Sequence, residues 1–115
     1  MSQKRPEAYL EDIHREAEQI KAFVRDMASS EFLSDVKTQY AVRLALAHIG
    51  EAVKRLPASL TDQHSNIPWK QIAGMRDRLV HEYATVDVEI VWRAATVSVP
   101  ELAAAVNAML QGEKQ

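Results

Sequence analysis

Hydrophobic residues recur every three or four positions along most of the chain, a spacing typical of α-helices that bury one face. From Pro6 to about Met27 this spacing predicts a first helix. Its apolar face consists of Leu10, Ile13, Ala17, Ile20, Val24 and Met27. Proline suits the first turn of a helix, because the N–H it lacks would have no partner there.

A second long helix is predicted to run to Leu56, with Ser34 or Asp35 as its N-cap. Pro57 then ends it, since proline cannot continue a helical hydrogen-bond pattern. The core-facing stripe of this helix is expected at Val36, Tyr40, Leu44 or Ala45, Ile49, Val53 and Leu56. Alanines on the same helix favour close approach of a neighbouring helix.

Residues 58–66 are polar and irregular, which predicts the one long connection in the chain. Ile67-Pro68 then starts a third helix, which we expect to include Arg76 and to continue to Tyr83.

Two shorter helices are predicted beyond residue 86. Asp87 is a suitable N-cap for a fourth helix, and Ser98 to Glu101 matches a capping box that starts a last helix ending near Gly112. A strand around Val86 to Val91 is disfavoured because no other segment offers it a partner strand. The predicted fold is therefore an all-α bundle of four to five helices, two of them long and antiparallel.

Length and composition narrow the class of protein. The 115 residues suit a single domain, residues 1–115, and the absence of cysteine removes disulfides, thiolate metal sites and cysteine nucleophiles. No apolar run reaches membrane-spanning length, so we expect a cytoplasmic protein without a membrane segment. The formal charge of -2 argues against charge-driven coating of nucleic acid, and any RNA contact must therefore be local.

The segment from Arg76 to Tyr83 contains the residue types that phosphate chemistry needs: a permanent cation, an imidazole and a phenol. On a helix Arg76 and Tyr83 share one side, whereas His81 lies about 140° from Arg76 and about 40° from Asp77. Asp77 is expected to orient the imidazole. His81 could act as a base toward an RNA 2′-hydroxyl and Arg76 could bind the phosphate, so no metal or other cofactor is needed.

The same spacing also occurs by chance on charged helices, where Arg76 would be a surface ion-pair partner and His81 a packed imidazole. A second histidine and carboxylate, His48 and Glu51, lie one helical turn apart, but a metal site needs further ligands and none is predicted. The residues alone leave catalysis and a structural role open.

Several segments together resemble the HepT-like HEPN family. They are residues 9–13 (YLEDI), 49–57 (IGEAVKRLP), 67–83 (IPWKQIAGMRDRLVHEY) and 86–92 (VDVEIVW). The resemblance spans nearly the whole chain and implies a HEPN-type helical bundle that forms a homodimer. It also implies a toxin of a toxin–antitoxin pair that cleaves RNA without a metal.

In this resemblance Arg76 and His81 correspond to the catalytic pair of the R-x4-6-H motif, and Asp77 to the polar residue that follows the arginine. Tyr83 corresponds to the tyrosine that a nucleotidyltransferase antitoxin of the minimal MNT type modifies with AMP. Two interpretations follow: an endoribonuclease toxin held by that antitoxin, or a helical binding module that partners the nucleotidyltransferase with little nuclease activity.

Overall fold

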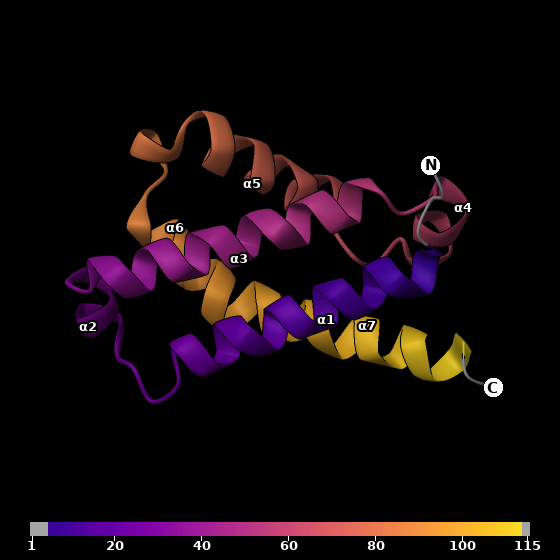
Figure 1. Ribbon diagram of the computed structural model, residues 1–115, viewed down its shortest axis with the longest axis horizontal. Helices are drawn as coiled ribbons and strands as arrows, with labels where there is room; N and C mark the ends of the chain where they lie inside the picture. The colour runs from indigo at the N-terminus through magenta and orange to yellow at the C-terminus, as the bar shows by residue number, and fades with distance from the viewer. Residues whose placement is uncertain (1–4, 114–115) are drawn as a thin grey trace.

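The computed structural model describes residues 5–113, except for the side chains of Tyr83 and Glu113. Its described part is an all-α bundle, as predicted, with long antiparallel helices α1 (Pro6–Phe23) and α3 (Val36–Lys54) side by side (Figure 1). Between them lies the short α2 (Ser29–Leu33). After α3 come α4 (Ala58–Thr61) and a 3-10 turn, η1 (Asp62–His64), in the segment predicted to be irregular.

The second half of the bundle packs on both sides of the first. Helix α5 (Trp69–His81) runs antiparallel to α3 and packs along it, and a 3-10 turn, η2 (Tyr83–Thr85), follows (Figure 1). Helix α6 (Val88–Arg93), a π-helical segment η3 (Ala94–Ser98) and α7 (Val99–Glu113) then lead back along α1. Among the described helices, none is long and apolar enough to cross a membrane.

Helix α1 buries Leu10, Ile13, Ala17 and Ile20, four of the positions predicted for its core face. The helix ends at Phe23 and not near Met27, because Asp26 takes the left-handed conformation with φ 59°. Aspartate tolerates this conformation better than most residues, and one such residue is incompatible with a continuing α-helix.

The stripe predicted for the second long helix is confirmed at Ile49, Val53 and Leu56, which are buried, and at Ala45, the alternative to Leu44, but it is wrong at the other positions of the first half of α3. Val36, Tyr40 and Leu44 are each 60% or more exposed, whereas Gln39 and Val42 are buried. The Gln39 amide donates hydrogen bonds to the carbonyls of Phe32 and Leu33, 2.8 and 3.2 Å away, so α2 covers the Gln39 side of α3. The predicted N-cap is confirmed, since the Asp35 carboxylate accepts a hydrogen bond from the Thr38 N–H at 3.0 Å.

The prediction of a new helix start at Ser98 is also wrong. The chain stays helical from α6 through η3 into α7, and Ser98 lies inside the π-helical segment. Pro100 has no N–H to donate to the carbonyl four residues earlier, and its ring would crowd that carbonyl in a regular α-helix. The wider π-helical turn next to Pro100 gives the chain this room without ending the helix. Asp87 is confirmed as the N-cap of α6, accepting from the Glu89 N–H at 2.9 Å.

Candidate active site

The candidate site lies along the line where α5 packs against α3. The Trp69 indole N–H donates to the His64 carbonyl at 3.0 Å and fixes the start of α5. Leu79 is the one fully buried side chain within α5, with Trp69, Ile72, Ala73 and Met75 packed at the edge of the core. Since α5 buries so little of its own surface, its fit against α3 depends on local contacts.

Gly50 provides the closest of these contacts. A Cβ placed on Gly50 would overlap the Cβ of Arg76 and lie 3.0 Å from its Cγ and 3.2 Å from the Ile72 carbonyl oxygen. Glycine inside a helix costs about 0.5–1 kcal/mol relative to alanine, so its presence here needs a reason. The reason is space: the missing side chain lets the stem of Arg76 lie directly against the α3 backbone.

Two carboxylates hold the Arg76 guanidinium once the stem is in place. Its Nε lies 3.2 Å from Oε2 of Glu51, and its Nη1 lies 3.1 Å from Oδ1 of Asp77. The side chain is only 25% exposed. Among the described contacts only the one from Nη1 is also a hydrogen bond, so the guanidinium keeps N–H donors for a ligand.

Asp77 does not pair with His81 as expected from the helical spacing. Its Oδ1 accepts from Lys54 Nζ at 3.1 Å as well as from Arg76. The hydrogen bond from Lys54 and then that from Arg76 lower the pKa of Asp77 below its usual value. The carboxylate therefore stays ionised, and two cations offset its charge near the site.

The Glu51 carboxylate forms ion pairs with two arginines. In addition to Arg76, Arg55 donates to its Oε1 from Nη2 at 3.0 Å and from Nε at 3.2 Å. The hydrogen bonds from Arg55 lower the pKa of Glu51 most, the positive charge of Arg76 lowers it further, and desolvation acts against both. Sequence reasoning gave Gly50, Glu51 and Lys54 no role in this site. The usable signal was a glycine in the interior of a long helix, which often marks close backbone approach.

His81 is the last residue of α5, and its side chain is exposed. Within the part of the chain that the structure describes, the imidazole makes no hydrogen bond or ion pair. Helix α5 ends here because Glu82 leaves the helical conformation, with φ -135° and ψ 34°. The prediction that the helix continues to Tyr83 is therefore wrong, because the backbone of Tyr83 belongs to η2. The side chain of Tyr83 lies outside the described part of the structure.

The second histidine and carboxylate pair from the sequence is also arranged differently. His48 bonds through Nδ1 to Oε1 of Glu16 on α1 at 2.7 Å, whereas Glu51 faces the arginines. Over residues 5–113, no three histidine, aspartate or glutamate side chains are grouped closely enough to hold a metal ion.

Comparison with known proteins places this arrangement in a family. The model of the family described as "Ribonuclease HepT-like" matches residues 13–109. A protein of Caldanaerobacter subterraneus named "Putative RNase" is 42% identical, with the match covering 96% of this chain and 99% of the relative. A protein of Thermococcus cleftensis named "Probable ribonuclease HepT" is 45% identical over 82% of this chain and 86% of its own length.

A further protein, from Methanocaldococcus jannaschii and also named "Putative RNase", is 41% identical over 83% of this chain and 82% of its own length. No solved structure gave a significant match. The family model and these relatives all cover most of the helical bundle, including the whole of α5. The chain therefore belongs to the HepT-like ribonuclease family.

Proposed function

We propose that the chain is a metal-independent endoribonuclease, with Arg76 and His81 as its catalytic residues and Asp77 as a supporting residue. The observation that carries the proposal is the seating of Arg76: a glycine makes room for its stem, and Glu51 and Asp77 hold its guanidinium. A surface arginine without such a role would not need this space or these two partners. The imidazole of His81 lies exposed at the end of the same helix.

RNA cleavage through these groups needs no added nucleophile. His81 accepts the proton of the 2′-hydroxyl as its oxygen attacks the neighbouring phosphorus, and Arg76 stabilises the charged phosphorane. The bond from phosphorus to the 5′-oxygen then breaks, and that oxygen takes a proton from an imidazolium. The products are a 2′,3′-cyclic phosphate and a free 5′-hydroxyl.

We propose that the active form is a homodimer in which two copies of α5 share one cleft. Support comes from a row of exposed apolar side chains on α3, namely Val36, Tyr40 and Leu44 at one-turn spacing, and from Val80 on α5, which is 45% exposed. Four large exposed apolar side chains on these two neighbouring helices favour a covered surface over a solvated one. In a twofold dimer one His81 can act as the base and the other as the acid.

We further propose that the protein is the toxin of a type II toxin–antitoxin pair and resides in the cytoplasm. Its antitoxin would be an MNT-type nucleotidyltransferase that transfers AMP to Tyr83. The spacing R-x4-H-x-Y supports this, because it places the phenol two residues beyond His81. An added AMP would bring a phosphate next to Arg76 and compete with RNA for the same cation. Residues 1–115 would act as one HepT-like domain.

The decisive experiment is cleavage of single-stranded RNA by purified protein in excess chelator, with analysis of the product ends by mass spectrometry. Arg76→Ala and His81→Ala should each lower the rate by at least 100-fold. Lys21→Ala, a surface change of the same charge on α1, should leave it unaltered. Cleavage that persists in both motif variants, or products without cyclic phosphate, would exclude this mechanism. Absence of any motif-dependent cleavage would favour the helical binding module.

A further inference from the structure

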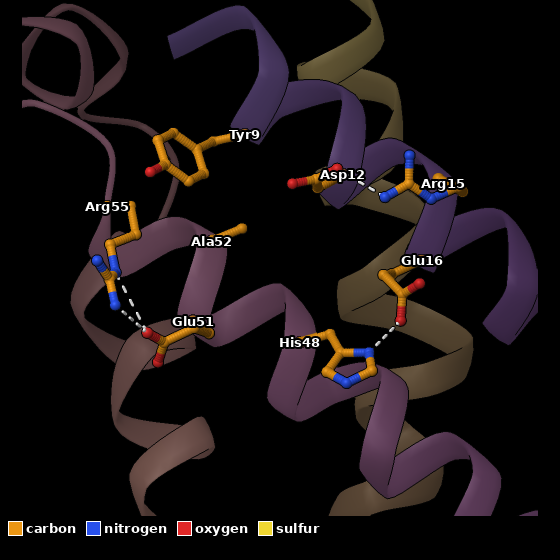
Figure 2. A pocket seen from close by; sticks show the side chains of 8 residues that line it. All are labelled: Tyr9, Asp12, Arg15, Glu16, His48, Glu51, Ala52 and Arg55. Atoms are coloured by element: carbon orange, nitrogen blue, oxygen red, sulfur yellow. Dashed lines mark hydrogen bonds and ion pairs between the residues drawn. The ribbon is translucent and has the colours of Figure 1, made fainter. Parts of the chain in front are cut away.

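A groove of about 330 Å³ runs between α1 and α3, next to the candidate active site but on the other side of α3. Its apolar surface includes Ala52 and the ring of Tyr9, and its rims are formed by charged side chains of both helices (Figure 2). The volume falls at the lower end of the range of small-ligand sites. The groove is therefore large enough for a planar group of nucleobase size.

The rims of this groove offer both donors and acceptors. On one side His48 is bonded through Nδ1 to Glu16 at 2.7 Å, and on the other Arg55 is bonded to Glu51 at 3.0 Å (Figure 2). A purely anionic ligand inside the groove would lie against the carboxylates of Asp12, Glu16 and Glu51. A nucleobase presents donors and acceptors on its edges and an apolar face, so it matches this lining better than a free phosphate does.

Glu51 connects the groove to the candidate active site. Its Oε2 faces Arg76 Nε at 3.2 Å, while its Oε1 faces Arg55 Nη2 at 3.0 Å. The two guanidinium groups therefore lie one carboxylate apart. A strand that places one phosphate on Arg76 can thus place the next near Arg55.

Charge and exposure favour the same path. Lys54, Arg55 and Arg76 are joined by Glu51 and Asp77, which leaves one excess positive charge in a chain whose formal charge is -2. The side chain of Arg55 is 61% exposed, compared with 25% for Arg76. Arg55 can reorient toward a second phosphate, while Arg76 stays fixed for the first.

We propose that Arg55 binds the phosphate next to the cleaved one and that the groove between α1 and α3 receives the adjoining base, so that the RNA strand crosses α3. This subsite rests on the proposed ribonuclease function, because it is defined relative to the phosphate on Arg76. The ligand class is a single-stranded RNA segment of at least three nucleotides, with the third nucleotide in the groove.

The test measures binding of 2′-O-methyl oligouridines of two, three and four nucleotides by the full chain, at several salt concentrations. The methyl group removes the nucleophile, so binding is observed without cleavage. Wild-type protein should bind the trimer roughly tenfold more tightly than the dimer. Arg55→Gln should lose most of this gain and reduce the salt slope by about 0.7, the value for one phosphate contact on a single strand.

His48→Gln should weaken trimer binding without changing the salt slope, because it alters the base subsite. Lys21→Gln removes the same charge from α1 outside the groove and should bind like wild type. Unchanged trimer affinity and salt slope in Arg55→Gln would overturn the proposal, provided that circular dichroism shows the variant folded. If cleavage depends on Arg76 and His81 but the trimer binds no more tightly than the dimer, only the subsite proposal fails. If the trimer binds more tightly than the dimer but no RNA is cleaved, the nuclease proposal fails and binding of RNA in the groove is retained.

Discussion

Replacing Gly50 with alanine adds one methyl group at the point where α3 and α5 are closest. The new Cβ would overlap the Cβ of Arg76 and lie 3.0 Å from its Cγ, whereas ordinary contacts are 3.4–4 Å. A Cβ is fixed to the backbone, and the Ile72 carbonyl at 3.2 Å cannot rotate away. Helix α5 must therefore shift outward at Arg76, by an amount on the order of 1 Å.

The energy terms partly cancel for folding but not for catalysis. Alanine improves helix propensity by up to about 1 kcal/mol, and overpacking costs about 1–3 kcal/mol, so the net loss of stability should be about 1–2 kcal/mol. A catalytic group displaced by about 1 Å can lose about 100-fold in rate. We expect Gly50→Ala to remain folded and to cleave RNA about 100-fold more slowly.

Urea unfolding and initial cleavage rates measure the two effects separately. The matched control is Gly74→Ala on α5, where a new Cβ would meet nothing within 4 Å. This variant should gain up to about 1 kcal/mol in stability and keep the wild-type rate. Wild-type cleavage by Gly50→Ala would refute the view that Gly50 exists to seat Arg76.

Three further outcomes are expected. Glu51→Gln should lower kcat roughly tenfold without raising KM, since the amide holds Arg76 less firmly but no longer repels phosphate; a raised KM at constant kcat in steady-state assays would contradict this. Asp35→Asn should lower the Tm at neutral pH. Hydrogen bonds from Thr38 lower the pKa of Asp35 below its ordinary 3.8, so this carboxylate stabilises the fold above 3.8 and ceases to do so as pH falls through the lowered value. The Tm difference should thus vanish as the pH falls below the lowered pKa of Asp35, and a constant difference would exclude the charge as its cause. If the protein forms the proposed dimer, Leu44→Glu should convert it to a monomer in sedimentation without loss of helicity; a dimer that persists in this variant would place the interface elsewhere.

Sequence patterns predicted the buried face of a helix well where the helix has a single apolar stripe. Helix α1 is such a case, and its buried face was identified from spacing alone. Helix α3 has apolar residues on two faces, and spacing cannot tell which face is buried. The prediction named Tyr40 with either Leu44 or Ala45. Contacts from α2 fix another side of α3 in the core, so Ala45 is buried, whereas Tyr40 and Leu44 are exposed.

Sequence patterns identified residues of the candidate site but did not predict which side chains they contact. Arg76 and His81 stand out by type and spacing, yet one of the two carboxylates that hold Arg76, Glu51, comes from α3, about 25 residues earlier. Helical angles suggested Asp77 for His81, whereas the structure pairs Asp77 with Lys54. Periodicity within one helix carries no information about such contacts between helices, and a single departure from helical geometry at Glu82 was enough to end the helix before Tyr83.

The π-helical segment Ala94–Ser98 sets the rotational register of the last helix. A π-helical turn contains about one residue more than an α-helical turn, so it is equivalent to a one-residue insertion within a continuous helix. If the same residues instead formed a regular α-helix there, the extra residue would no longer be absorbed by the wider turn, and all that follows would be rotated by about 100°. Leu102 and Val106, which are buried, would then leave the core. The packing of α7 thus depends on the length of this segment as much as on its composition.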